Sequence, residues 1–199
     1  MLSRPNRFLL NLLAACCVLV SGPATSAGDA AVHRSEDVRI DVTRSRDVIK
    51  VRADFLVAVS AQEAFAVLTD YDHMRDFLPG VVESRVVQRS ADKLLVSQSL
   101  RLRLGFLSLP VDSVRSVALE PPYRLVSRAV SGTISKAEVV TTLSEDRGKT
   151  LVTYESAAEV SSWLPEAIGT AIVGRQVREQ LTSMRAEMLR RQGATGTKR

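Results

Sequence analysis

From residue 47 onward, apolar and polar residues alternate over long stretches, which is typical of β-strands with one buried face. The first stretch is DVIKVRADFLVAV, residues 47–59, and six more follow residue 80. Turn signals separate these six, at Ser90-Ala91-Asp92, Pro121-Pro122, Gly132 and Asp146-Arg147-Gly148. The pattern predicts about seven antiparallel strands, with VRIDV, residues 38–42, as a further short candidate.

Helical signals occupy the places where this alternation stops. Ser60 and Glu63 have the spacing of a capping box, which predicts a helix directly after the first long strand. A second short helix is expected over residues 71–77, before a Pro-Gly pair. Pro165 marks the start of a long last helix, which is expected to end at Gly193. Its apolar residues recur at helical spacing: Ile168, Ile172, Val177, Leu181, Met184 and Met188.

This order of elements predicts an α+β fold in which a curved antiparallel sheet surrounds the long C-terminal helix. The chain has 199 residues, enough for one domain with a sizeable core. We expect that domain over residues 47–192, after a polar segment at 28–46 and before a flexible basic tail at 193–199.

The first 27 residues differ from the rest in charge and hydropathy. Two arginines and no acid precede the apolar run FLLNLLAACCVLV, and small residues follow it at Thr25 and Ala27. This is the order of a secretory signal peptide, and it predicts export to the bacterial periplasm. An uncleaved anchor is the alternative, although the run is short for a membrane span.

A second processing site overlaps this segment. Leu13-Ala14-Ala15-Cys16 fits the lipobox of bacterial lipoproteins, in which the cysteine is lipidated. The residues after Cys16 remain apolar, which favours the ordinary signal peptide. Cleavage after Ala27 removes both cysteines of the chain, so the mature protein would have no disulfide, thiol nucleophile or cysteine metal site.

The basic excess of the chain is mild. Cleavage removes Arg4 and Arg7 but no acid, so the formal charge falls from +5 to +3. Much of the excess lies in the last helix, where a solvated face is the main interpretation and weak contact with an anionic membrane surface is the alternative. Nucleic-acid binding is not expected, because the sequence has no basic block with interleaved aromatic residues.

The densest polar cluster lies around the second short helix and consists of Asp70, Asp72, His73 and Asp76. A zinc site needs three or four ligands, mostly His or Cys, and the only other histidine is His33. Asp70 precedes the helix, where its carboxylate would accept hydrogen bonds from the first N–H groups. Helix capping and solvation are therefore expected here, and no metal.

Three predicted strands carry polar residues on faces that are otherwise apolar. These residues are Gln98 in the strand 93–106, Ser113 and Arg115 in 109–119, and Tyr154 and Ser156 in 148–160. Such a face suits a ligand cavity with polar anchors, and open strand ends or a register shift would explain it equally well. Arg115 is the most informative, because a buried arginine needs an acidic partner or an anionic ligand group.

Signals for catalysis are sparse. The sequence contains no G-x-S-x-G motif and no glycine-rich phosphate loop. The strand acids fall on the polar side of the alternation, away from a shared pocket: Glu83, Glu138, Glu155 and Glu159. No cofactor is expected.

The stretch SAQEAFAVLTDYDHMRDFLPGVVESRVV resembles the START-related helix-grip superfamily, and within it the polyketide cyclase/dehydrase and coenzyme-Q-binding branch. The shared features are a helix that ends in Asp70-Tyr71, then Phe77-Leu78-Pro79, and a valine-rich strand with Ser84. The resemblance spans about residues 47–192. It implies two short helices after the first strand and an apolar space between the sheet and the long helix.

The resemblance implies a monomeric protein that sequesters or carries a hydrophobic small molecule or lipid. The alternative is a cyclase- or dehydrase-type enzyme for polyketide-like or aromatic substrates, with Tyr154, Arg115 and Gln98 as acid or oxyanion groups. The ligand-binding residues are expected near the mouth of the space, on the strand faces and on the last helix: Tyr71, Phe77, Leu78, Pro79, Val96, Gln98, Leu100, Arg115, Tyr154, Ser156, Trp163, Ile168 and Ile172.

Overall fold

The structure is a computed structural model, and it describes residues 37–104, 107–134, 136–159 and 170–196. The predicted signal peptide with its lipobox Cys16 lies outside the described residues, as do Trp163 and Ile168.

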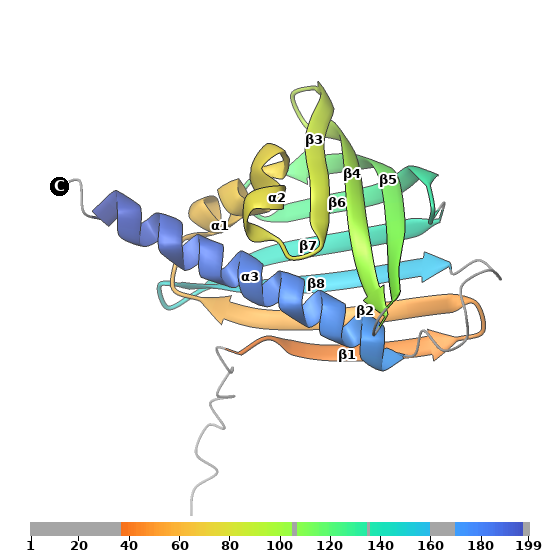
Figure 1. Cartoon of the computed structure of the whole chain (residues 1–199). Helices are drawn as coiled ribbons and strands as arrows, with labels where there is room; N and C mark the ends of the chain where they lie inside the picture. Colours follow the sequence, from red (N-terminus) through yellow and green to blue (C-terminus); the bar gives the residue numbers. More distant parts are fainter. Residues whose placement is uncertain (1–36, 105–106, 135, 160–169, 197–199) are drawn as a thin grey trace, which may run out of the picture. The chain divides into compact units, whose positions relative to one another are not determined.

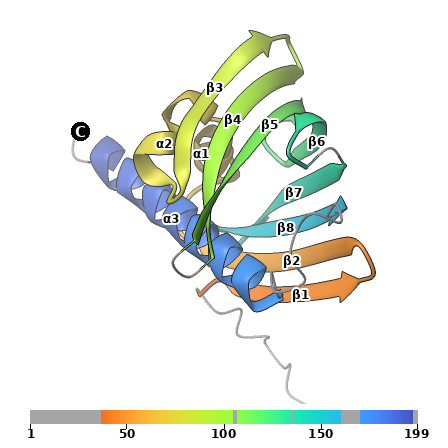
Figure 2. The ribbon, with the colours of Figure 1, turned by 45° about the vertical axis from the view of Figure 1, so that its right-hand side comes forward.

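Eight antiparallel strands form one curved sheet, which Figures 1 and 2 show from two directions. The strands are β1 (Arg39–Ser45), β2 (Val48–Val57), β3 (Val81–Arg89), β4 (Lys93–Leu104), β5 (Leu107–Glu120), β6 (Arg124–Gly132), β7 (Ala137–Asp146) and β8 (Lys149–Glu159). Their order across the sheet is β1-β2-β8-β7-β6-β5-β4-β3. The last six strands thus form a continuous meander, and β2 joins it by pairing with β8.

The strand β1 confirms the further candidate at residues 38–42 as an eighth strand, and it places the start of the sheet before residue 47. It pairs with β2 along its whole length, from Arg39↔Asp54 to Ser45↔Val48. Ile40 and Val42 are its half-buried residues, and its other side chains are polar and exposed. Such polarity is typical of an edge strand that is protected from pairing with other chains, and it leaves only a short alternating stretch in the sequence.

Four helical segments accompany the sheet: α1 (Ala61–Leu68), the 3₁₀ turn η1 (Tyr71–His73), α2 (Met74–Phe77) and α3 (Thr170–Gly196). The predicted capping box is confirmed, because the Glu63 N–H donates to Ser60 Oγ and the Ser60 N–H donates to the Glu63 carboxylate. The single helix expected over 71–77 is instead divided into η1 and α2.

The helix α3 crosses the concave side of the sheet, as the fold prediction required. The predicted end at Gly193 is wrong, since α3 continues to Gly196. Gly193 does not adopt the left-handed conformation that ends many helices, and a glycine inside a helix costs only about 1 kcal/mol relative to alanine. In the part of the chain that the structure describes, no helix is long and apolar enough to cross a membrane.

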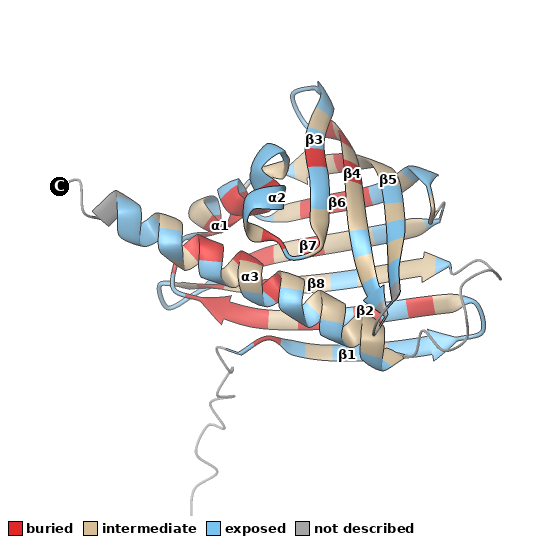
Figure 3. Cartoon of the chain, in the orientation of Figure 1, coloured by how far each residue is buried: buried red, intermediate tan, exposed pale blue. Residues whose placement is uncertain are grey.

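The core is most tightly closed under α1, α2 and the second half of α3. Leu181, Met184 and Met188 of α3 are buried there, against strand residues such as Phe55 and Val152. The first half of α3 differs, because its residues 170–180 are exposed or only half-buried (Figure 3). The helix therefore seals the sheet at one end and covers it more loosely at the other.

Candidate functional site

Two cavities lie between the inner face of the sheet and α3. The smaller one, about 140 Å³, lies beneath η1, α2 and the middle of α3. Its apolar lining consists of Leu68, Met74, Leu78, Val81, Leu100, Leu125, Val139, Leu181 and Met184. Its polar lining consists of Tyr71, Gln98, Arg115, Ser127, Thr141, Tyr154 and Gln180.

The larger cavity, about 220 Å³, lies under the first turns of α3 and is mostly apolar. Its apolar lining consists of Ile49, Val51, Leu100, Leu102, Val111, Ile134, Ala158, Val173 and Val177. Its polar residues are Arg101, Thr133, Ser156, Gln176 and Gln180.

The two cavities follow one another along α3. Residues 173–180 of the helix border the larger cavity and residues 180–184 border the smaller one, so Gln180 belongs to both. Leu100 of β4 is the second shared residue, on the sheet side of the junction. Together the cavities extend along eleven residue steps of the helix, or about 16 Å. They lie end to end along α3, and the smaller cavity has the larger share of polar lining residues.

Among the described residues that line the smaller cavity, Arg115 is the only charged one. It lies on the inner face of β5, opposite Val96 of β4 and Ala129 of β6. Among the described residues, its guanidinium forms no salt bridge and no hydrogen bond. A partly buried guanidinium without a partner is costly, so this position is suited to an oxygen-bearing group from outside the chain.

Neutral hydroxyl groups surround Arg115. Burial raises the pKa of the Tyr71 phenol, and the nearby positive charge of Arg115 opposes that rise. Tyr71 is therefore protonated at neutral pH and is a hydrogen-bond donor. Thr141 and Tyr154, a directly opposed pair on β7 and β8, add two further hydroxyl groups to the wall.

Ser127 is the second polar group of this wall without a partner. It is 7% exposed, and its Oγ is the only buried side-chain oxygen or nitrogen in the described residues that lacks a hydrogen bond. Ser127 faces Val117 on β5, two residues beyond Arg115, so the two side chains are diagonal neighbours on the same face. A buried hydroxyl without a partner costs about 1–3 kcal/mol, which a bound acceptor or donor would offset.

Gln98 differs from these residues because its amide is already engaged. Its Nε2 donates to Ser84 Oγ at 3.0 Å and lies 3.5 Å from Met74 Sδ. The bonds join β4 to β3 and to α2 across the side of the cavity. Of the three residues proposed as acid or oxyanion groups, Arg115 and Tyr154 therefore remain available, whereas Gln98 holds α2 in place.

The described lining of the two cavities offers no carboxylate or imidazole as a general base. Within the described residues that line them, no Asp, Glu or His is present. The strand acids named above are exposed, as the alternation predicted. Proton abstraction at neutral pH usually needs such a group.

The structure distributes the thirteen predicted ligand-binding residues over several places. Six line the smaller cavity: Tyr71, Leu78, Gln98, Leu100, Arg115 and Tyr154. Ser156 lines the larger one. Four line neither cavity: Phe77, Pro79, Val96 and Ile172. Val96 is fully buried in the core, and Phe77 packs beneath the Arg191 guanidinium.

Sequence reasoning missed several cavity residues, and the most important are Ser127 and Thr141. Both follow the alternation that identified Arg115, since Ser127 shares a face with Leu125, and Thr141 with Val139. The signal was thus present in the strands RLVSRAV and AEVVTTLSE. The glutamines of α3 had no comparable signal, because on a helix a polar residue is usually solvated.

A hollow of about 400 Å³ on the opposite face of the sheet has a different character. It lies over β1, β2, β8 and β7, and its charged residues are Asp41, Lys50, Arg52, Glu138 and Glu155. Arg52 and Glu155 pair with one another at 2.7 Å. The charges there are mixed and exposed, so the hollow is a solvated surface and not an apolar site.

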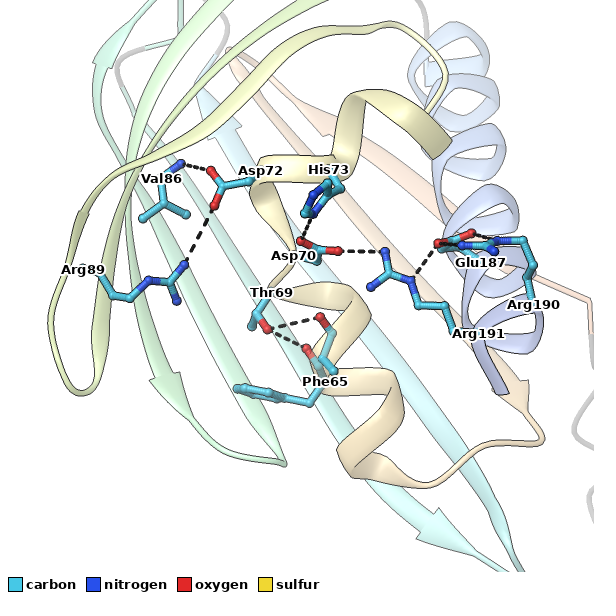
Figure 4. Close-up of polar contacts among 11 residues, drawn as sticks. Phe65, Thr69, Asp70, Asp72, His73, Val86, Arg89, Glu187, Arg190 and Arg191 are labelled. Atoms are coloured by element: carbon cyan, nitrogen blue, oxygen red, sulfur yellow. Dashed lines mark hydrogen bonds and ion pairs between the residues drawn. The ribbon is translucent and has the colours of Figure 1, made fainter. Parts of the chain in front are cut away.

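A network of ion pairs joins the segment of η1 and α2, which covers the smaller cavity, to the last turns of α3 (Figure 4). Asp70 lies 2.6 Å from His73 Nδ1 and 2.8 Å from Arg191 Nη2. Arg191 Nε lies 2.7 Å from the buried Glu187 carboxylate, and the Arg191 guanidinium lies 5.6 Å from the centre of the Phe77 ring. We call these five residues the latch.

The latch corrects the expectation that Asp70 caps the short helix. Its carboxylate forms no hydrogen bond to the N–H groups of η1. Burial raises the pKa of Asp70, but the hydrogen bond with His73 and the Arg191 guanidinium lower it further, so it lies below its usual value. The same hydrogen bond raises the pKa of His73. Tertiary contact with α3, which is far away in the sequence, decides the role of this acid.

The other acids of the cluster also have structural partners. Asp72 accepts a hydrogen bond from the Val86 N–H at 2.7 Å, which attaches η1 to β3. Asp76 is exposed and has only a weak contact with Arg75 at 3.9 Å. No group of three or more metal-ligating side chains occurs in the part of the chain that the structure describes.

The latch predicts a loss of stability in acid. The hydrogen bond from Arg190 lowers the pKa of the buried Glu187 to about 2, against a usual value of 4.5. Since the folded-state pKa is the lower one, this contribution is fully present above pH 4.5 and is lost as the pH falls toward 2. The Glu187 carboxylate thus contributes as much as about 3 kcal/mol to the free energy of unfolding.

Urea unfolding from pH 7 to 3 measures this contribution. The free energy of unfolding should fall less steeply with decreasing pH in Glu187→Gln than in the native chain. The exposed Asp76→Asn variant is the control, and an equal change in both variants would contradict the prediction.

The latch is also expected to slow the opening of residues 71–78, which cover the smaller cavity. Replacing Arg191 with leucine removes the contact to Asp70 and the cation over Phe77, so amides of residues 71–78 should exchange hydrogen about 10-fold faster. Arg190→Leu is the matched control, because Arg190 also pairs with Glu187 but is mostly exposed. Hydrogen-exchange mass spectrometry gives the measurement. Equal protection in both variants would show that the ion pair does not hold the cover.

Residues 57–185 match the model of a family described as polyketide cyclase/dehydrase and lipid transport. No curated protein sequence matches the chain significantly. Among solved structures, a STAR-related lipid transfer protein from Xanthomonas axonopodis has a TM-score of 0.64 at 16% identity, covering 77% of this chain and 94% of that one. A START superfamily protein from Mycobacterium smegmatis has a TM-score of 0.60 at 13% identity, covering 71% and 97%.

The Zhui aromatase/cyclase from Streptomyces sp. R1128 has a TM-score of 0.60 at 14% identity, covering 72% of this chain and 95% of that one. At these identities the likeness shows the fold alone, and it confirms the helix-grip architecture predicted from the sequence. The family model matches well over half of the chain. The chain therefore belongs to the polyketide cyclase/dehydrase and lipid transport family.

Proposed function

We propose that the protein binds a hydrophobic small molecule or lipid between its sheet and α3, and sequesters or carries it. The observation that supports this most directly is the pair of mostly apolar cavities placed in series along α3. Apolar surface buried there would contribute about 25 cal/mol per Å² to the affinity, less the cost of ordering the ligand. A similar solved structure is described as a lipid transfer protein, which agrees with this role.

We propose further that the protein acts outside the cytoplasm. The charge, apolar run and small residues of the first 27 residues support a cleaved signal peptide and a periplasmic protein, with a lipid anchor at Cys16 as the alternative. The intact mass of the protein from its own host distinguishes the two. A chain that starts at Gly28 supports the periplasmic carrier, and a lipidated chain that starts at Cys16 overturns it.

The binding function is tested by native mass spectrometry of the protein purified from its host envelope, followed by extraction under denaturing conditions. We expect an apolar compound bound one to one to a monomer, which the extract then identifies. A bare chain that is also not stabilised against heat by any of a panel of apolar compounds would contradict the proposal.

The second candidate function is a cyclase- or dehydrase-type enzyme that acts on a polyketide-like or aromatic substrate. In its favour, Arg115, Tyr154 and Tyr71 line the same cavity, where they would stabilise a developing oxyanion. Against it, the described lining lacks an acid or imidazole to serve as a general base. If Arg115→Gln and Tyr154→Phe together left a measured cyclisation rate unchanged, the enzyme assignment would fail.

A further inference from the structure

The smaller cavity carries one positive charge that nothing in the described chain neutralises. Arg115 is the only charged residue in its described lining, and the guanidinium has no acidic partner among the residues that the structure describes. The Ser127 hydroxyl, diagonal to it on β6, is buried and has no hydrogen bond. Two polar groups without partners on one apolar wall indicate where a ligand presents its own polar group.

The larger cavity indicates the size and polarity of the remaining part of such a ligand. It begins at Leu100 and Gln180, where the smaller cavity ends, and its lining is mostly aliphatic. Its 220 Å³ corresponds to roughly seven volumes of the size of a water molecule, each of about 30 Å³. A methylene group is of similar size. The space along α3 therefore suits a narrow chain that extends from the charged end.

From this arrangement we infer that the ligand is an amphiphile with a single carboxylate, bound by Arg115 and Ser127, and a hydrocarbon chain of medium length in the larger cavity. The inference rests on the proposed binding function and names the class of ligand for the same site. A carboxylate offers two oxygens to the fork of a guanidinium and accepts a bond from a hydroxyl.

The charge of the cavity favours a carboxylate over a phosphate as the anionic head group. A carboxylate carries one negative charge and would neutralise the charge of Arg115 in the smaller cavity. The second cation along the ligand space, Arg101, lines the larger cavity and is exposed, so it is solvated by water. A phosphate monoester carries about −1.5 to −2 at neutral pH, so part of its charge would have no cationic partner among the described residues that line the smaller cavity. The surrounding hydroxyls of Tyr71, Thr141 and Tyr154 are neutral, so none of them adds a positive charge.

The test compares three probes of equal chain length with the purified protein after removal of bound lipid. Isothermal titration should show that dodecanoate binds at least about 10-fold more tightly than methyl dodecanoate, since only the acid forms a charge-assisted pair. Dodecanoate should also bind more tightly than dodecyl phosphate. In Arg115→Gln the preference of the acid over its ester should disappear, and in Ser127→Ala it should decrease.

Arg128→Gln is the matched control. Arg128 lies on β6 beside Ser127 but is exposed and pairs with Glu138, so its replacement removes the same charge outside the cavity and should leave the preference intact. Thermal unfolding of each variant shows whether it is folded. Should Arg115→Gln not fold, the acid-to-ester ratio in the native chain and the Ser127→Ala variant still decide the question.

The outcomes separate the inference from the function on which it rests. Equal binding of dodecanoate and its methyl ester would overturn the carboxylate but leave hydrophobic binding in place. Tighter binding of dodecyl phosphate would likewise overturn it. If no probe binds and no other apolar compound does, the proposed function itself fails.

Discussion

Replacement of Leu100 with tryptophan is expected to reduce binding of an apolar ligand by about 100-fold while the protein stays folded. Leu100 lies at the junction of the two cavities, so a larger ring there fills the space through which one ligand would occupy both. A ligand forced against this ring meets an overpacking cost of about 1–3 kcal/mol and also loses apolar contact area. Displacement of the neutral fluorescent probe phenylnaphthylamine measures the change in affinity.

The control for this variant is Val130→Trp. Val130 lies on β6 with 58% of its surface exposed, so the same ring is added outside both cavities. This control should bind the probe as the native chain does. Unchanged binding by Leu100→Trp, confirmed to be folded by circular dichroism, would place the ligand elsewhere and remove the main support for the proposed function.

Replacement of Gly132 with alanine is expected to destabilise the fold by about 4 kcal/mol. Gly132 has a φ of +124°, a conformation that costs other residues about 1–3 kcal/mol. An added Cβ would also overlap the backbone of β5, since the Asp112 carbonyl oxygen lies where that atom would need space. Urea unfolding of the variant gives the free energy directly.

The matched control for Gly132 is Gly148→Ala. Gly148 also has a positive φ, at +77°, but an added Cβ there meets no atom within 4 Å. Its replacement should cost only about 1–2 kcal/mol, the penalty of the backbone conformation alone. Equal destabilisation of the two variants would show that the close approach of β5 and β6 is not the cause.

The close approach of β5 and β6 at Gly132 also connects this residue to the ligand site. The β5–β6 register shifts between Val114 and Arg115, just beyond the Ser113↔Gly132 pair. A bulge of this kind changes the direction of the side chains that follow it. A form of Gly132→Ala that remains folded at low temperature is therefore expected to lose the preference for dodecanoate over its ester as well.

Much of the fold is readable in the sequence because its signals are local. The Ser60–Glu63 capping box and the turn at Asp146-Arg147-Gly148 each depend on residues that are neighbours along the chain. The alternation also separated the exposed acids from the inner residues of β4, β5 and β8 correctly. The errors lie at weak local signals: the domain was expected to start at residue 47, after β1, and the last helix was expected to end at Gly193.

The candidate site was only partly readable, because the same residue types serve in the core and in the cavity wall. Val96 and Leu100 lie four residues apart on the same face of β4. Val96 is nevertheless fully buried, whereas Leu100 borders both cavities. Their difference depends on where α3 passes over the sheet. That path is set by packing between segments about eighty residues apart, which the periodicity of either segment does not encode.

By itself, the sequence determined the order of the elements, the inner face of each long strand and the position of Arg115 on such a face, since these depend on spacing and turn chemistry. Only the tertiary structure decided that Arg115 and Ser127 line one cavity without partners among the described residues, that Asp70 binds Arg191 of α3, and that two cavities lie along that helix. Partners and empty space are properties of segments brought together by folding, so they become visible only after the sheet has curved around α3.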